Sequence, residues 1–473
     1  MQQLSSTLII FTCLSLTVTS CARFQDRPLN PIGSAERIEA RTLSSQALRD
    51  FFKSVIVNKT RWPPKTWDID RLTLAAIYYH PDLAVARAQA ETADAGNTTA
   101  AQRPNPNITL SPTWISNLAT AAAPWIAASS LSIPIETAGK RGFRMAKTEH
   151  LTDAARLRAA DTAWLVRGRL RLAMLEMYAA LEAERLLQQQ LSIQRSMTER
   201  LEQQLSAGEI THLEVIRSHL ALNQLQLNVN AAHKRVAESQ VLLATAIGIP
   251  VDALARIELD FSKLAQPPDL SLLPIAKLKE TALRKRPDIL AAIEDYAAAQ
   301  SALQLEIANQ YPNIQANPGY TWEMGEHRWL LGATALQLPI LHQNQGPIAE
   351  AEAKRNELTV RFEALQMRIL GEIDRAHAGL ASVLAKWRDA EKQMRLQQDN
   401  LHSAQAWFNA GETDHLSLLG AELENAVAER ARLDVLVETQ QVFNVLEDTL
   451  RYPIASSLTA TLISDSAMRK TPQ

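Results

Sequence analysis

Cys21 is the residue whose position most clearly predicts a chemical modification. It follows Val18-Thr19-Ser20, which ends a short apolar stretch beginning at Leu8. A short apolar core with small residues just before a cysteine is typical of a secretory leader, here residues 1–20, and the cysteine sulfur would then take a diacylglycerol. The alternative interpretation is an ordinary free or buried thiol.

The mature chain is therefore expected to contain no thiol. Cys13 would leave with the leader and Cys21 would be acylated, so neither remains for a disulfide or a metal. Ala22 follows the cysteine, and the sorting rule for bacterial lipoproteins sends chains without Asp at this place to the outer membrane. The sequence thus predicts a lipid-anchored protein that is stabilised by packing.

Lys140 follows Gly139 at the expected start of a helix, a pairing that also occurs in phosphate-binding loops. The spacing excludes such a loop, because no glycine lies five residues before Gly139 and Arg141 stands where Ser or Thr is needed. Together with Arg144, these basic side chains are expected either near lipid head groups or at a solvated helix start.

The ten histidines show no spacing that predicts a metal site. No His-x-x-x-His pair occurs, and no cysteine is left as a partner ligand. A nucleophile elbow, a paired-carboxylate signature and a glycine-rich nucleotide loop are also missing from the sequence. We therefore predict no catalytic residue, no metal ligand and no cofactor, and do not expect an enzyme.

The composition allows a large folded protein and argues against nucleic acid as a partner. The 473 residues carry 49 basic and 51 acidic side chains, a formal net charge of -2, so no basic field exists. Beyond the leader, no stretch approaches eighteen uninterrupted apolar residues, and a membrane-spanning helix is not expected.

An internal duplication organises the chain. His80-Pro81-Asp82-Leu83 returns as Arg286-Pro287-Asp288-Ile289, displaced by 206 positions. Ala207-Gly208-Glu209 returns as Ala410-Gly411-Glu412, displaced by 203 positions. An offset that drifts so little predicts two copies of one unit with small insertions or deletions.

Each copy contains a long segment without proline. The first lies between Pro134 and Pro250 and the second between Pro347 and Pro453, and both are rich in strong helix formers. From Gly139 to the break at Gly208 is roughly seventy residues, enough for a helix about 100 Å long. We expect such a rod in each copy, turning at its Ala-Gly-Glu tip into a shorter returning helix.

Two segments before each rod alternate apolar and polar residues with the period of a strand. They cover residues 108–114 and 125–135 in the first copy, and 314–322 and 330–340 in the second. The pattern is that of a transmembrane β-barrel, and a soluble hairpin packed on the helices is the alternative. Four strands with open edges cannot sit in lipid, whereas three chains would supply twelve and close the barrel.

From residue 70 to residue 454 this order of elements resembles the TolC family of outer-membrane efflux channels. The resemblance implies a mainly α fold with a small antiparallel β part, and a homotrimer whose 12-stranded transmembrane β-barrel continues into a periplasmic α-helical barrel. The expected segments are a signal peptide (1–20), a lipid-anchored extended segment (21–68), a first repeat (69–254), a linker (255–273), a second repeat (274–454) and a tail (455–473).

Ala138-Gly139-Lys140-Arg141-Gly142 is similar to the heavy-metal branch of this family, typified by CzcC. This similarity implies export of divalent heavy-metal cations, with a periplasmic adaptor and an inner-membrane pump of the resistance-nodulation-division type as partners. Drugs or polypeptides are alternative cargoes for the same duct. A lipid-anchored periplasmic coiled-coil scaffold is the rival from another class of protein.

The resemblance also implies roles for particular residues. The two tips, Ala207-Gly208-Glu209 and Ala410-Gly411-Glu412, would contact the adaptor; their glycines would also end the rods, with Thr211 or Thr413 capping the next helix. Asp399 lies about three turns from the second tip, where three copies could form an acidic ring that gates the lumen. An ordinary exposed Asp is the alternative.

Overall fold

The computed structural model describes residues 22–55, 62–116, 125–268, 274–323, 325–334, 340–454 and 462–465. The chain divides into two units, residues 1–41 and residues 42–473. The first unit contains α2 (Pro31–Glu39), which begins with a proline and is capped by Asn30, whose side chain accepts a hydrogen bond from the Gly33 N–H.

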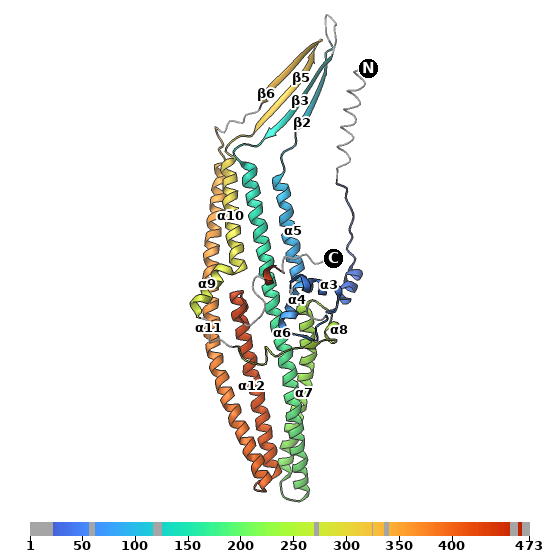
Figure 1. The fold of residues 1–473 in the computed structure, drawn as a ribbon, viewed down its shortest axis with the longest axis vertical. Coiled ribbons are helices and arrows are strands. Elements are labelled where there is room, and N and C mark those ends of the chain that lie inside the picture. The colour runs from blue at the N-terminus through green and yellow to red at the C-terminus, as the bar shows by residue number, and fades with distance from the viewer. Residues whose placement is uncertain are drawn as a thin grey trace. The chain divides into compact units, whose positions relative to one another are not determined.

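The second unit contains two successive sets of elements in the same order: helices, a strand pair, a very long helix and a shorter returning helix (Figure 1). The first set comprises α3 (Gln46–Val55), β1 (Thr66–Trp67), α4 (Ile69–Tyr79), α5 (Pro81–Ala101), β2 (Asn107–Trp114), β3 (Trp125–Ile135), α6 (Lys140–Ser206), α7 (His212–Ile247), α8 (Val251–Leu254) and β4 (Glu258–Leu259). The second comprises α9 (Ile275–Lys285), α10 (Pro287–Ala308), β5 (Ile314–Glu323), β6 (Glu326–Thr334), α11 (Gln345–Ala410) and α12 (His415–Leu450). This order confirms the predicted duplication.

The two rods are continuous helices. α6 has 67 residues and α11 has 66, so each is about 100 Å long. The returning helices α7 and α12 have 36 residues each and pack along the rods. Pro347 lies in the first turn of α11, where its missing N–H would have no partner in any case. Within the described residues, none of the helices is both long and apolar enough to cross a membrane.

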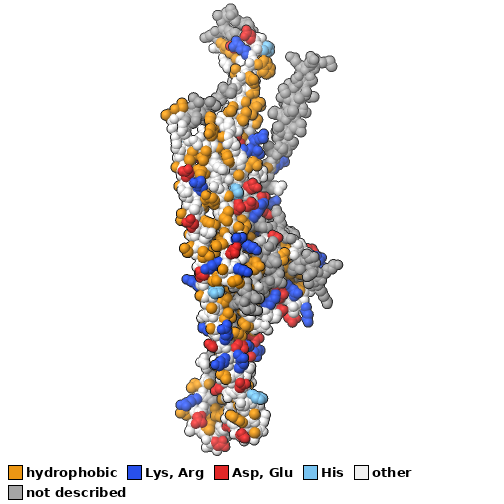
Figure 2. Space-filling model, turned by 60° about the vertical axis from the view of Figure 1, so that its left-hand side comes forward, with side chains coloured by type: hydrophobic (Ala, Val, Ile, Leu, Met, Phe, Trp, Pro, Cys, Tyr) orange, Lys and Arg blue, Asp and Glu red, His pale blue; other side chains and the backbone are white. Residues whose placement is uncertain are grey.

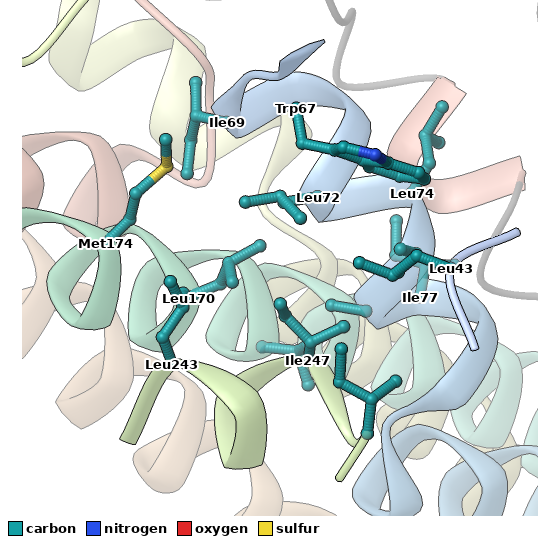
Figure 3. Close-up of a cluster of buried hydrophobic side chains, with 14 of the residues drawn as sticks. Leu43, Trp67, Ile69, Leu72, Leu74, Ile77, Leu170, Met174, Leu243 and Ile247 are labelled. Carbon is teal, nitrogen blue, oxygen red and sulfur yellow. The ribbon is translucent and has the colours of Figure 1, made fainter. Parts of the chain in front are cut away.

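The largest hydrophobic core lies where α4 packs against α6 and α7 (Figure 3). Leu72 from α4, Leu170 from α6 and Ile247 from α7 are each fully buried there. A smaller core lies in the second repeat, around Ile369 on α11 and Phe443 on α12. These cores explain why long amphipathic helices with few aromatic residues hold together.

Residues 21–68, expected to be extended, include the helices α2 and α3. Phe52 of α3 packs edge-on against the buried Trp67, with ring centroids 6.1 Å apart. Trp67 belongs to β1, which pairs in parallel with β4 through Thr66 and Glu258. Aromatic burial thus folds part of this segment onto the first repeat.

The four longer strands form one antiparallel sheet in the order β2-β3-β5-β6. The sheet follows directly from the ends of α5 and α10 and leads into α6 and α11 (Figure 1). The return strand predicted at 330–340 is displaced: β6 begins at Glu326 and ends at Thr334, while residues 335–339 lie outside the description. The reason is a tight turn at Gly325, whose φ of 88° lets Glu323 pair with Glu326.

Candidate functional site

One face of the sheet is apolar and the other is polar. The register places Leu110, Ser129, Tyr320 and Trp329 side by side in one row across the four strands, and the next row contains Thr109, Ser130, Gly319 and Leu330. Side chains in adjacent rows point to opposite faces. The predicted alternation is therefore confirmed for most positions, although Ile126 and Leu330 lie on the polar face and Ser129 lies on the apolar face.

The apolar face is uncovered in the single chain. Trp329 is 82% exposed and Leu331 is 91% exposed, values far above those of core residues. Trp114 and Trp125 stack edge to face at the far end of β2 and β3, with ring centroids 4.7 Å apart. Figure 2 shows hydrophobic side chains running along the sheet. A continuous apolar face of this kind is suited to contact with lipid or with another protein.

Lys140 links the start of α6 to the residues just before β5. Its ammonium group donates to the Tyr311 carbonyl at 2.6 Å and to the Asn313 side-chain oxygen at 2.7 Å. The preceding residues Ala138 and Gly139 have left-handed φ values of 55° and 72°, which turn the chain from strand to helix. Burial lowers the pKa of Lys140, although Glu136 partly opposes this effect.

The other basic residues of this joint bind the end of α5. Arg141 donates to the Ala101 carbonyl at 2.8 Å, and Arg144 donates to the Ala100 carbonyl at 2.9 Å and to Glu136 at 2.7 Å. Free carbonyls at a helix C-terminus attract cations in this way. The expectation of a solvated helix start is wrong for the buried Lys140, which joins the two repeats, whereas Arg141 and Arg144 are partly exposed and bind within the first repeat.

A buried ionic seam connects α6 of the first repeat with α12 of the second. The Arg167 guanidinium donates to Glu447 at 3.1 Å, with both side chains almost fully buried. Arg171 donates to the Gln440 side chain at 2.8 Å and lies over the Phe443 ring. Sequence reasoning missed this seam because its members are about 280 positions apart; its only signal was two arginines one helical turn apart among apolar residues.

Asp448 belongs to the same seam. Burial raises the pKa of its carboxyl to about 6, against the attraction of Arg451 and Arg167. Asn444 donates to this carboxyl at 3.1 Å. Gly168 lies directly opposite on α6, and a Cβ at that position would collide with the carboxyl oxygens. The glycine therefore allows the close approach of α6 and α12.

The two tips have the same backbone structure. Gly208 and Gly411 have φ values of 77° and 74°, which end each rod in the left-handed conformation. In each tip, the residue after the glycine donates its N–H to the carbonyl five residues earlier, at 2.9 Å; the pairs are Glu209 with Gln204 and Glu412 with Trp407. Both glycines thus end the rods as predicted, by a Schellman motif.

Of the two predicted N-caps after the tips, Thr211 is in the expected position and Thr413 is not. Thr211 precedes α7 but makes no capping hydrogen bond with its side chain. At the second tip the helix begins one residue later than expected, and Asp414, not Thr413, accepts from the Ser417 N–H at 2.9 Å. The hydrogen bonds from Ser417 hold the pKa of Asp414 below its usual range.

The remaining predicted sites are not brought together with any of these features. Asp399 is exposed on α11, and in the described part of the chain its carboxylate forms no ion pair. Cys21 lies outside the described residues. Among the residues with described placement, no group of three His, Cys, Asp or Glu side chains could hold a metal ion.

Known proteins resemble this chain in sequence. Residues 75–249 match the family described as outer membrane efflux protein. Over 267 residues the chain is 27% identical to the pyoverdine export outer membrane protein OpmQ of Pseudomonas aeruginosa. Over 333 residues it is 22% identical to the cobalt-zinc-cadmium resistance protein CzcC of Cupriavidus metallidurans. Over these residues the chain resembles the outer membrane efflux protein family.

Coverage of these relatives is partial. The match to OpmQ includes 54% of this chain and 53% of OpmQ, so the chain spans about half the length of that relative. The match to CzcC includes 68% of this chain and 76% of CzcC. The names of these two relatives refer to different cargoes.

Solved structures share the fold of this chain. A membrane protein from Pseudomonas aeruginosa has a TM-score of 0.65 and 19% identity, covering 91% of this chain and 99% of that one. The channel CusC has the same TM-score and coverage at 17% identity. The outer-membrane channel OprN follows with a TM-score of 0.64. The fold of this chain is thus a mainly helical one with a small antiparallel sheet, as in these proteins.

Proposed function

We propose that this chain is the outer-membrane exit duct of a tripartite export system and acts as a trimer. The observation that carries the proposal is a four-stranded sheet with one uncovered apolar face, joined directly to helical rods about 100 Å long. A sheet of this kind fits lipid, and rods of this length fit the space between two membranes. The match of residues 75–249 to the outer membrane efflux protein family supports both assignments.

The sheet supports a trimer through its edges. β2 and β6 are the outer strands of the order β2-β3-β5-β6, so each leaves one edge unpaired in the single chain. Lipid provides no hydrogen bonds for such edges, and only a closed barrel satisfies them. Three copies of four strands would give a 12-stranded barrel in which β6 of one chain pairs with β2 of the next. The longer strands β3 and β5, with 11 and 10 residues, match the length that a tilted membrane strand needs.

Lipidation of Cys21 would hold the amino-terminal segment to the same membrane. The proposed mature chain begins at residue 21, with repeats at 69–254 and 274–454, a linker at 255–273 and a tail at 455–473. The tips at Gly208 and Gly411 would then point into the periplasm, because the sheet and the tips are at opposite ends of the rods. There they would meet a periplasmic adaptor and, through it, an inner-membrane pump of the resistance-nodulation-division type.

Divalent metal cations remain our proposed cargo, and CzcC, a cobalt-zinc-cadmium resistance protein, supports them. OpmQ, a pyoverdine export protein, favours a siderophore as the second candidate. Asp399 would contribute one acidic side chain per chain to a cation-selective constriction. Comparing the metal sensitivity of a deletion strain with its siderophore secretion would separate the two cargoes.

Trimer formation in the outer membrane tests the duct against the rival, a lipid-anchored coiled-coil scaffold. We expect the full chain in the outer-membrane fraction as a trimer that migrates as one band without heating and as a monomer after boiling. Variant Cys21→Ser separates the anchor from the barrel, since a barrel keeps its trimers in the membrane without the lipid. Release of this variant as a soluble monomer would support the scaffold and overturn the duct.

A further inference from the structure

The two tips share one backbone but differ in their side chains. Both rods end in the same hydrogen-bonded turn, so position 204 in the first tip corresponds to position 407 in the second. The first position is occupied by Gln204 and the second by Trp407. Two surfaces with equal shape and different chemistry are expected to bind a partner with different strengths.

The charge of the tips differs as well. Residues 396–428 include five acidic side chains and no Lys or Arg. The corresponding residues 193–225 include four acidic side chains and three arginines. The net charge is therefore -5 for the second tip and -1 for the first. The acidic residues of the second tip are Asp399, Glu412, Asp414, Glu422 and Glu424. This end of the second repeat therefore presents a negative field that the first repeat lacks.

Most of these acids are available to a partner. Asp414 is engaged as the cap of α12 and lies close enough to Arg200 of the first tip to feel its charge. Glu412 and Glu424 are exposed, and in the described part of the chain neither forms an ion pair. Unpaired exposed carboxylates are suited to steer a basic partner toward the tip.

Trp407 supplies an apolar anchor beside these charges. Its side chain is 55% exposed, although the residues next to it are packed: Phe408 stacks on His415 with ring centroids 5.4 Å apart and borders a small core that includes Leu418. A tryptophan held on a packed helix end loses little freedom when it is covered. Such aromatic residues carry a large share of the binding energy in protein interfaces.

From this asymmetry we infer that the second tip, residues 396–428, is the main recognition site for the adaptor, and that the matching adaptor surface is a helical hairpin with Lys or Arg beside an apolar pocket for Trp407. The inference rests on the proposed function and deepens it. The first tip has the same turn and would dock without contributing much to selectivity. Charge complementarity favours a basic protein surface over an acidic one as the occupant.

Matched substitutions in the full-length trimer test this inference. The probe is the purified periplasmic adaptor encoded with this chain, and the readout is its dissociation constant for the detergent-solubilised trimer. Trp407→Ala is compared with Gln204→Ala. The double variant Glu412→Gln/Glu424→Gln is compared with the double variant Glu209→Gln/Glu214→Gln. The three control residues lie on the first tip: Gln204 and Glu209 occupy the positions of Trp407 and Glu412, and Glu214 serves as a second acidic side chain.

We expect Trp407→Ala to weaken adaptor binding at least about tenfold and the second-tip charge variant about fivefold, while both first-tip variants change it less than about twofold. Raising the salt concentration should weaken binding to the wild type and hardly affect the second-tip charge variant. Reaction of the adaptor with a photocrosslinker at position 407, and not at 204, would support the same conclusion.

Three results would overturn the inference. Equal losses for the two tips would show that both repeats recognise the adaptor alike. Stronger binding after removal of the second-tip acids would show that the adaptor surface is acidic. Dissociation of the trimer by Trp407→Ala would assign this side chain to the contact between subunits. If the wild-type trimer binds no adaptor, the proposed function itself fails, and this outcome is distinct from equal losses at two functioning tips.

Discussion

The Arg167 guanidinium on α6 lies 3.1 Å from the Glu447 carboxylate on α12, and both side chains are buried. The pair joins the rod of the first repeat to the returning helix of the second. Glu447 also accepts a hydrogen bond from the Ile454 N–H at 2.6 Å, which fixes the end of the second repeat. Breaking the pair should therefore loosen the contact between repeats and not merely one helix.

Removal of Arg167 tests this contact. Arg167→Met leaves the Glu447 carboxylate buried with a weaker partner, and we expect a loss of about 3 kcal/mol in the free energy of unfolding. Arg169→Met is the matched control, because Arg169 pairs with Asp82 at the surface and such pairs contribute at most about 1 kcal/mol. Urea midpoints of the detergent-solubilised proteins measure the difference. Equal midpoints for the two variants would contradict a structural role for the seam.

Gly168 and Gly371 are glycines within the two rods, but they have different surroundings. A Cβ at Gly168 would collide with the buried Asp448 carboxyl, whereas nothing lies within 4 Å of a Cβ at Gly371. We expect Gly168→Ala to destabilise the protein by about 1–3 kcal/mol through overpacking. Gly371→Ala should stabilise it by up to about 1 kcal/mol through helix propensity. Thermal unfolding of both variants checks the opposite signs; a stabilising Gly168→Ala would show that α6 and α12 are not in close contact there.

Asp448 predicts a dependence of stability on pH. Burial raises its pKa from 3.8 to about 6, so the native state retains a proton that the unfolded chain has lost. The stability that the protonated Asp448 carboxyl contributes is fully present below pH 3.8, and it is lost as the pH rises through 6. Above that range the buried carboxylate costs up to about 3 kcal/mol.

The variant Asp448→Asn should therefore be more stable than the wild type above pH 6 and equally stable near pH 4. Asp434→Asn is the control, since Asp434 is an exposed side chain on the same helix. Unfolding midpoints of the three proteins across this pH range provide the measurement. A constant difference between Asp448→Asn and the wild type would show that this carboxyl does not titrate in the window.

The two faces of the sheet should differ in their tolerance of charge. Leu110 lies on the apolar face and Ser111 on the polar face of β2. Arginine on a lipid-facing strand costs about 2–4 kcal/mol near the bilayer centre, so Leu110→Arg should reduce the amount of heat-modifiable trimer severely. Ser111→Arg would project into the lumen and should assemble normally. The reverse result would place the polar face against lipid and invert the proposed barrel.

The large elements were predictable because their signals are periodic and repeated. Proline-free segments indicated α6 and α11, and alternation indicated the sheet, including its polar and apolar faces. Local chemistry was less predictable. Lys140 was expected at lipid or solvent, yet it binds Tyr311, and this contact depends on how the two copies pack together. The pairing of Arg167 with Glu447 was not predictable for the same reason. The glycines at the tips were predictable because a left-handed turn needs no distant partner.

Conductance of the purified chain in a planar lipid bilayer tests the central claim most directly. The proposed trimeric duct predicts discrete current steps whose frequency rises with the amount of assembled trimer, and their absence when boiled monomer is added. Leu110→Arg should yield few insertions, and Ser111→Arg should yield channels of altered conductance. A trimer that inserts no channels at any voltage, or a chain that remains a soluble monomer, would contradict the account.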